Sequence, residues 1–297
     1  MTVNVASSRM WLQYSHGAGT GAARLAFRAV SVAIYLPERP TRFAPTELAR
    51  GPWDPNAQHG GAPAALIARA VEQVASVVPM DVVRLTYEFL RPVPLTPLDL
   101  RTRVLRDGKR VQLVEATLEA GGQEVARATA LRIRSEAVPA PDGDRERPAH
   151  GGPDVSAPIE MPAFEAGPTM FARDGMEVRF AHGAFADVGP AFAWFRLRVP
   201  LVAGEQPSPL QRLAAAGDFG NGIAAAVPWA THVFINPDLT LYVERLPRGE
   251  WVGLDAITRV GEAGIGVSDS ALYDEHGRVG RAQQGLYVAE RPGRSAG

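Results

Sequence analysis

Residues 98–104 read Leu-Asp-Leu-Arg-Thr-Arg-Val, and residues 254–260 read Leu-Asp-Ala-Ile-Thr-Arg-Val. Two further matches keep the same order along the chain: residues 125–129 (Val-Ala-Arg-Ala-Thr) with 279–283 (Val-Gly-Arg-Ala-Gln), and Leu85-Thr86 with Leu239-Thr240. The offset is about 155 residues at all three places. This period is too long for a solenoid repeat, so the chain carries two copies of a unit the size of a small domain.

The first copy combines one helix with several strands. Gly60-Gly61 opens an apolar stretch that ends before Pro79. Because this stretch is apolar around most of a helix circumference, we expect a buried helix. Alternating apolar and polar residues, separated by Gly-containing turns, predict the strands. These lie at about 42–49, 82–89, 98–106, 110–119 and 124–133.

The second copy repeats this plan. Ser208 followed by Pro209 predicts a helix start, since Ser is a preferred N-cap residue and Pro a preferred first helical residue. The expected strands lie at about 176–180, 191–201, 232–244, 251–260, 266–273 and 278–288.

One buried helix wrapped by a long antiparallel sheet is the hotdog architecture. The predicted fold class is therefore α+β: a double hotdog, in which two tandem repeats pair side by side so that their edge strands are satisfied. The expected organisation is a loose N-terminal leader (1–30), an N-terminal hotdog (31–134), a linker (135–170) and a C-terminal hotdog (171–297). The linker is predicted because Pro, Gly and charged residues crowd the stretch from 135 to about 160.

Composition excludes several classes of function. Lys+Arg (31) and Asp+Glu (32) nearly balance, which disfavours a nucleic-acid binder. Cys is absent, so disulfides, thiolate metal sites and a Cys nucleophile are excluded. With six scattered His residues, we expect no metal site and no cofactor. No apolar run is long enough for a membrane span, and the first residues lack the order of a signal peptide, so a cytoplasmic location is expected.

No Gly-x-Ser-x-Gly elbow is present, which leaves acid–base and electrostatic chemistry. The order of several short motifs resembles the bacterial acyl-CoA thioesterase II family and its actinobacterial thioesterase-like relatives, over about 36–134 and 175–290. These motifs include Gln58-His59-Gly60-Gly61, Phe-Leu-Arg-Pro at 89–92, Gly217-Asp218-Phe219-Gly220-Asn221-Gly222, Ile-Asn-Pro-Asp-Leu-Thr at 235–240 and Val-Gly-Arg-Ala-Gln at 279–283.

The resemblance implies hydrolysis of acyl-CoA by a water that an Asp, a Thr or Ser, and a Gln orient. Asp218 falls at the position of the Asp, and Gln283 at that of the Gln. At the hydroxyl position the sequence departs from the family, because Asn236 stands there and the nearest hydroxyl belongs to Thr240.

The resemblance also gives the start of the first helix a role. Main-chain N–H groups near Gly60 and Gly61 would stabilise the oxyanion. His59 is expected to line the mouth of the site. Each of these residues also has a plain structural interpretation, as a turn, packing or strand residue.

The expected partner is therefore an acyl-CoA substrate of fatty acid metabolism, with no nucleic acid and no membrane, and a homo-oligomer by analogy with other hotdog proteins. Two alternatives stay open at this stage. A non-catalytic acyl-CoA binding protein is favoured by the departure at Asn236. An enoyl-CoA hydratase is disfavoured, because the next His after Asp218 is His232, fourteen positions further on.

Overall fold

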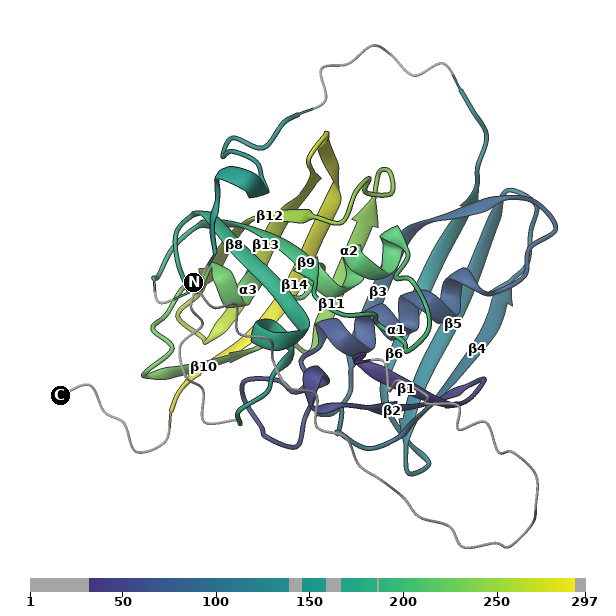
Figure 1. Ribbon diagram of the computed structural model, residues 1–297, viewed down its shortest axis with the longest axis horizontal. Helices are drawn as coiled ribbons and strands as arrows, with labels where there is room; N and C mark the ends of the chain where they lie inside the picture. Colours follow the sequence, from purple (N-terminus) through teal and green to yellow (C-terminus); the bar gives the residue numbers. More distant parts are fainter. Residues whose placement is uncertain (1–31, 139–145, 159–166, 186, 292–297) are drawn as a thin grey trace, which may run out of the picture. The chain divides into compact units, whose positions relative to one another are not determined.

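The computed structural model describes residues 32–138, 146–158, 167–185 and 187–291, so the leader expected at 1–30 lies outside the described residues. Within them the strands form one antiparallel sheet (Figure 1). Its order is β1-β2-β4-β5-β6-β3-β11-β14-β13-β12-β9-β8-β7, and β10 also pairs with β14.

The N-terminal half supplies six strands and helix α1 (Gly61–Glu72). The strands are β1 (Tyr35–Arg39), β2 (Arg42–Pro45), β3 (Met80–Phe89), β4 (Leu98–Arg106), β5 (Val111–Ala120) and β6 (Gln123–Arg134). The strand expected at 42–49 is shorter than predicted, because the Thr46 side chain caps a 3-10 turn at Glu47–Ala49.

Helix α1 is buried from Gly61 to Val71, as its apolar circumference predicts. It ends earlier than expected, at Glu72, well before Pro79. Two β-branched residues, Val77 and Val78, precede that proline, and the residue before a proline favours extended backbone, so a helix is disfavoured there.

The C-terminal half supplies helices α2 (Pro209–Gly217) and α3 (Gly220–Ile223) and the remaining strands. The strands are β7 (Ala157–Pro158), β8 (Met176–His182), β9 (Ala191–Leu197), β10 (His232–Ile235), β11 (Asp238–Val243), β12 (Val252–Val260), β13 (Ile265–Asp274) and β14 (Gly277–Glu290). The predicted N-cap is confirmed: Ser208 Oγ accepts a hydrogen bond from Gln211 N at 3.1 Å.

The two copies join through β3 and β11, where Thr86 lies opposite Thr240. The other neighbours of β3 and β11 are also equivalent. Thr86 lies opposite Thr129 on β6, and Thr240 lies opposite Gln283 on β14. The sequence repeat is thus an approximate two-fold relation in space. β3 and β11, which would be edge strands in separate hotdogs, form main-chain hydrogen bonds with each other in one continuous sheet. This confirms the double hotdog.

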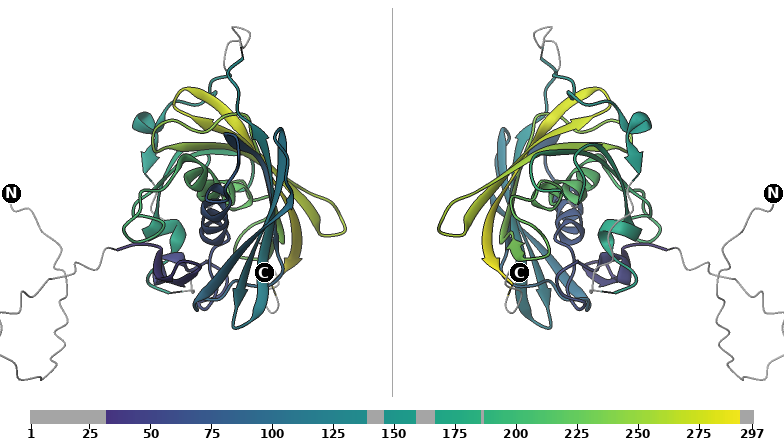
Figure 2. Two further views of the ribbon diagram at one scale, coloured as in Figure 1. Left: turned by 90° about the vertical axis from the view of Figure 1, so that its right-hand side faces the viewer. Right: turned by 90° about the vertical axis from the view of Figure 1, so that its left-hand side faces the viewer.

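Helices α1 and α2 lie within the curve of the sheet (Figure 2) and run antiparallel to each other. The start of α1 contacts the end of α2, where a Cβ atom on Gly61 would approach the Ala215 carbonyl oxygen to 2.5 Å. At their other ends, the Glu72 carboxylate accepts hydrogen bonds from Ser208 Oγ at 2.7 and 2.8 Å. A carboxylate at the start of α2 is favourable for the helix dipole.

The single strand expected at 232–244 is two strands, β10 and β11, because a bulge separates them. Ile235 pairs with Tyr287, but Thr240 pairs with Gln283, so the register against β14 shifts by one residue between them. Pro237 lies in the gap, and its ring nitrogen cannot donate to the ladder. Because of this shift, side chains after the bulge point to the opposite face of the sheet from the one that the alternation in β10 predicts.

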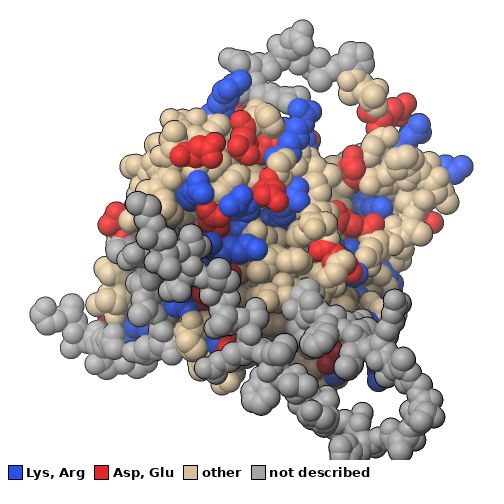
Figure 3. Space-filling model, in the orientation of Figure 1, with Lys and Arg blue, Asp and Glu red and all other residues tan. Residues whose placement is uncertain are grey.

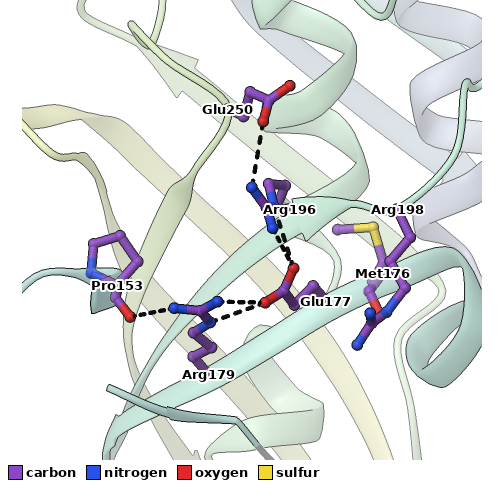
Figure 4. Close-up of polar contacts among 7 residues, drawn as sticks. All are labelled: Pro153, Met176, Glu177, Arg179, Arg196, Arg198 and Glu250. Carbon is purple, nitrogen blue, oxygen red and sulfur yellow. Dashed lines mark hydrogen bonds and ion pairs between the residues drawn. The ribbon is translucent and has the colours of Figure 1, made fainter. Parts of the chain in front are cut away.

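Residues 146–156, within the expected linker, run along the outer face of the sheet, and β7 then pairs with the edge of β8. These linker residues cover an aromatic cluster separate from the main core: Phe192, Trp194, Trp251 and Tyr273. Trp194 Nε1 donates to the Gly151 carbonyl oxygen at 2.9 Å. Figure 4 shows the Glu177 carboxylate between Arg179 and Arg196, and Arg179 donates to the Pro153 carbonyl oxygen at 2.9 Å. On the face in Figure 3, basic and acidic side chains are intermixed rather than gathered by sign.

Candidate active site

Asp218 is the residue around which the predicted site assembles. It caps the C-terminal end of α2, and only 5% of its surface is exposed. Oδ1 accepts hydrogen bonds from Asn236 Nδ2 at 2.8 Å and from Gln284 Nε2 at 3.2 Å. Oδ2 lies 3.1 Å from Nδ1 of His59, which belongs to the other half of the chain. The buried carboxylate therefore has polar partners on both oxygens.

Gly60 makes this meeting of the two halves possible. It is the N-cap residue of α1, and a Cβ atom there would lie 2.7 Å from Asp218 Oδ2. Any side chain would therefore displace the carboxylate from the start of the helix. The positive end of the α1 dipole lies beside the Asp218 carboxylate in consequence.

A second close approach places α3 against the sheet. A Cβ atom on Gly220 would lie 2.5 Å from Ser270 Oγ and 3.0 Å from Ser268 Oγ. Because α3 lies so near to β13 and β14, the main-chain N–H of Asn221 reaches Gln284 Oε1 at 3.1 Å. The amide of Gln284 is thus fixed at its oxygen by α3 and at its nitrogen by Asp218.

The structure brings Gln284 to Asp218, and not Gln283 as expected from the sequence. Gln283 is exposed on the outer face of β14, whereas Gln284 is 2% exposed on the inner face. The repeat match aligned Gln283 with Thr129, and both indeed occupy equivalent positions, but on the outer face of the sheet. A signal for Gln284 was present, because it is a polar residue at the inward position between buried Ala282 and Leu286 in an alternating strand.

Asn236 lies beside Asp218, and Thr240 does not. The bulge between β10 and β11 explains the difference. Asn236 shares the inner face with Phe234, whereas Leu239 and Leu241 are the inward residues of β11 and Thr240 faces out. The hydroxyl considered from the sequence is therefore on the wrong face of the sheet to reach Asp218.

His59 contacts both the helix start and the carboxylate. Its Nδ1 atom accepts from Gly61 N at 3.1 Å or donates to Asp218 Oδ2 at the same distance, depending on the tautomer. Its ring stacks on Phe219, with centroids 4.4 Å apart, and lies 5.2 Å from Phe171. The other histidine considered, His232, has its Nδ1 atom 2.8 Å from Thr231 Oγ1.

The segment before His59 is held by a buried hydrogen-bond chain. Tyr35 donates from its hydroxyl to Gln58 Oε1, and Gln58 Nε2 donates to the Pro94 carbonyl oxygen at 2.7 Å. Complete burial raises the pKa of Tyr35 well above its usual value, so the phenol stays a neutral donor. The position of His59 is therefore set by main-chain anchoring as well as by its ring contacts.

The approximate two-fold axis relates this site to a different arrangement at the start of α2. There Glu72 takes the place of Asp218, but Ser208 and Gln211 saturate its carboxylate with hydrogen bonds. The residues at the repeat offset from Gln284 and Asn236 are Ala130 and Val82, which are apolar and buried. The Glu72 carboxylate thus stabilises the start of α2. No counterpart of the Asn236 and Gln284 amides lies beside it at the two equivalent positions.

Among the residues that the structure describes, no group of three or more His, Cys, Asp and Glu side chains is placed to hold a metal ion. No helix in the described part of the chain is long and apolar enough to cross a membrane.

Comparison with known families gives two matches that follow the two halves. A model of the acyl-CoA thioesterase N-terminal domain matches residues 49–133, and a model of the acyl-CoA thioesterase C-terminal domain matches residues 141–288. No curated protein matches the sequence.

Solved structures share the fold at low sequence identity. A candidate thioesterase from Novosphingobium aromaticivorans is 23% identical, with a TM-score of 0.67 over 86% of this chain and 99% of that one. A hotdog protein of unknown function from Alicyclobacillus acidocaldarius is 16% identical, with a TM-score of 0.66 over 86% and 95%. An acyl-CoA thioesterase II from Mycobacterium marinum is 18% identical, with a TM-score of 0.62 over 88% and 97%.

Proposed function

Because the chain belongs to the acyl-CoA thioesterase family, we propose that the group around Asp218 is its active site and that Asp218 is the general base. The observation that carries this proposal is the meeting of a buried carboxylate with the start of a helix from the other half of the chain. A base and a set of main-chain N–H donors are thereby placed side by side, which is the arrangement that hydrolysis of a thioester needs.

The two oxygens of Asp218 have different tasks in this proposal. Oδ1 is held by two amide N–H groups, from Asn236 and Gln284. Oδ2 faces Gly60 and is the oxygen that removes a proton from water. The water oxygen bonds to the thioester carbonyl carbon, the C–S bond then breaks, and the proton passes to the departing CoA thiolate.

Asn236 and Gln284 therefore act through Asp218. The resemblance implied that the amide of Gln283 would orient the water directly. The glutamine beside Asp218 is Gln284, whose Nε2 atom donates to the carbonyl oxygen and to Oδ1 of Asp218, while its Oε1 atom accepts from Asn221 N. We assign both amides as positioning residues that keep the carboxylate in one orientation.

The tautomer of His59 decides whether the Gly61 N–H can donate to the oxyanion. Its Nδ1 atom cannot accept from Gly61 N–H and donate to Asp218 at the same time. When Nδ1–H donates to Asp218 Oδ2, the Gly61 N–H at the start of α1 is free to donate to the oxyanion of the tetrahedral intermediate. The tautomer with a proton on Nδ1 is thus the productive one.

A homo-oligomer is part of the proposal. Three exposed apolar side chains lie directly opposite one another on the outer face of neighbouring strands: Ile235, Tyr287 and Ile265, which are 45%, 61% and 70% exposed. One such row can pair with its own copy across a two-fold axis. Light scattering should give a mass above the monomer, and Tyr287→Glu should lower it.

The cytoplasmic location stays a prediction, which cell fractionation would check.

The experiment is a panel of short, medium, long and aromatic acyl-CoA substrates, in which a thiol reagent reports the CoA released. The protein has no Cys, so it gives no background signal. Asp218→Asn keeps the size of the side chain and should lower kcat by about 10²–10⁴-fold, the usual contribution of a general base. Binding in calorimetry with the thioester intact would instead support a non-catalytic binder. Loss of crotonyl-CoA absorbance without CoA release would support a hydratase.

A further inference from the structure

Three aromatic side chains, which we call the tryptophan cluster, lie beside the proposed active site: Trp53, Trp229 and Phe234. The rings of Trp53 and Trp229 stack with centroids 4.7 Å apart and an interplanar angle of 14°. Phe234 meets both rings edge-on, at 5.4 Å from Trp53 and 4.5 Å from Trp229. Trp53 comes from the N-terminal half and the other two from the C-terminal half, so the cluster spans the two halves as the active site does.

The tryptophan cluster continues the inner face on which the polar residues lie. Phe234 is two residues before Asn236 on that face, and Leu286 is two residues after Gln284. Together with Ala225 and Val288, they form an apolar cluster separate from the main core. An apolar part of the inner face therefore begins where the proposed water-activating residues end.

On α3, Gly222 places no side chain against the tryptophan cluster. Gly222 lies on α3, and a Cβ atom there would meet only the Trp229 ring, at 4.0 Å. Gly222, Trp53, Trp229 and Asn236 are all partly exposed. Solvent therefore reaches part of the tryptophan cluster and part of Asn236 beside Asp218.

The far side of the tryptophan cluster is closed by Arg291. Its guanidinium lies 5.4 Å from the centre of the Trp53 ring. Its Nε atom donates to the carbonyl oxygens of Trp229 and His232, at 3.0 and 3.1 Å. The stacked indoles are therefore fixed from behind, and they form a wall rather than a loose surface.

On the opposite side of the site the space is already filled. Phe171 and Phe219 pack on His59, and Phe195 lies 4.6 Å from Phe219. All three Phe rings belong to the main core and are at most 2% exposed. Of the two apolar groups next to Asp218, the tryptophan cluster is the one that solvent reaches.

We propose that the acyl group packs against the solvent-exposed part of the tryptophan cluster, and that Trp53 and Trp229 limit the length of acyl chain that is hydrolysed. The inference rests on the proposed function. The thioester carbonyl must lie at Asp218, the polyanionic CoA must extend to water, and the acyl chain must enter apolar space. Because Arg291 holds the stacked indoles from behind, we expect them to stop a longer acyl chain.

The test compares wild type with Trp229→Ala and Trp53→Ala on straight-chain acyl-CoA substrates from butanoyl to hexadecanoyl. We expect the ratio of kcat/KM for long chains to that for short chains to rise about tenfold or more, the usual discrimination for a methylene that a pocket cannot hold. Trp229→Leu and Trp53→Leu are milder variants, for use where the Ala variants do not fold. Tyr242→Ala removes an aromatic side chain that is 49% exposed on the outer face, and should leave the ratio unchanged.

A binding measurement separates the acyl group from CoA. A non-hydrolysable acyl-CoA thioether should change the Trp fluorescence of wild type, and should change that of a Trp53→Phe, Trp229→Phe double variant much less. Free CoA should have little effect on either protein. An unchanged chain-length ratio, or an equal response to free CoA, would overturn the inference while leaving the proposed hydrolysis intact. Absence of turnover in wild type would contradict the proposed function instead, and the thioether arm would still decide where the acyl group lies.

Discussion

Gln284 holds Asp218 at two points, donating from Nε2 to its main-chain carbonyl oxygen at 3.1 Å and to its carboxylate Oδ1 at 3.2 Å. Because the amide oxygen is fixed by Asn221 N–H, the carboxylate cannot rotate without breaking a buried hydrogen bond. Asp218 is thus pre-oriented before substrate arrives, which is the condition under which a base is most effective.

The first prediction concerns the two neighbouring glutamines. Gln284→Ala should lower kcat by about 10²-fold, the scale of a misplaced catalytic group, with little change in KM. Gln283→Ala is its matched control on the same strand and should keep wild-type kcat, because that side chain faces outward. Steady-state kinetics on one acyl-CoA substrate compares them. Equal losses in both variants would contradict the assignment.

The second prediction concerns the third partner of the carboxylate. Asn236→Ala removes the 2.8 Å hydrogen bond to Asp218 Oδ1 and should lower kcat by about tenfold or more. Asn236→Asp should be worse, because it places a like charge beside the base. Thr240→Val removes the outward hydroxyl and should have no effect on turnover. A large loss in Thr240→Val would show that the hydroxyl acts in the site after all.

The third prediction tests the tautomer of His59. An Asn side chain can place an N–H near the position of Nδ1, whereas a Gln side chain places its amide nearer the position of Nε2. His59→Asn should therefore retain more activity than His59→Gln, which leaves Asp218 Oδ2 without this donor and should lower kcat by about 10²-fold, the scale of a misplaced catalytic group. The order of kcat between the two variants is the measurement. The reverse order would indicate that Nε2 does the work.

The fourth prediction concerns space at the helix start. Gly60→Ala should reduce activity strongly, because its Cβ atom would lie 2.7 Å from Asp218 Oδ2 and must displace the carboxylate. Gly152→Ala is the control, since a Cβ atom there meets nothing within 4 Å. Thermal unfolding should be followed alongside turnover. Full activity in a folded Gly60→Ala variant would show that the close approach is unnecessary.

The fifth prediction concerns pH and stability. Burial by itself raises the pKa of Asp274, but hydrogen bonds from Arg245 and from the main-chain N–H groups of Arg248 and His276 outweigh it and hold the pKa below its usual value. A lowered folded-state pKa means that the stabilisation is present at neutral pH and is lost as pH falls through that value. Asp274 is 0% exposed, so Asp274→Asn should cost roughly 3–5 kcal/mol at neutral pH.

The pH dependence distinguishes this ion pair from a general packing effect. The difference in unfolding free energy between Asp274→Asn and wild type should shrink as pH falls below about 4, because the unfolded chain then binds a proton on this carboxyl before the folded protein does. Glu262→Gln, at an exposed position, should match wild type at every pH. Denaturant unfolding from neutral to acid pH makes the comparison, and a constant difference would rule out linkage to this carboxyl.

The sequence by itself determined the repeat, and with it the double hotdog and the position of most strands. The family resemblance also selected Asp218 and Asn236, which form a hydrogen bond in the structure, and their role in catalysis stays a proposal. The leader and the boundaries of the linker stay predictions. Gln284 lay within reach of sequence reasoning, as a polar residue at an inward position of an alternating strand.

Only the tertiary structure decided how these residues meet. The bulge between β10 and β11 changes which face each side chain takes, so it separates Asn236 from Thr240. A one-residue register shift of this kind costs little locally, and it leaves no mark in composition or period. His59 reaches Asp218 because α1 and α2 pack antiparallel, and that contact joins two copies far apart along the chain. Local sequence preferences determine the fold of each copy, whereas packing between the copies brings the candidate site residues together.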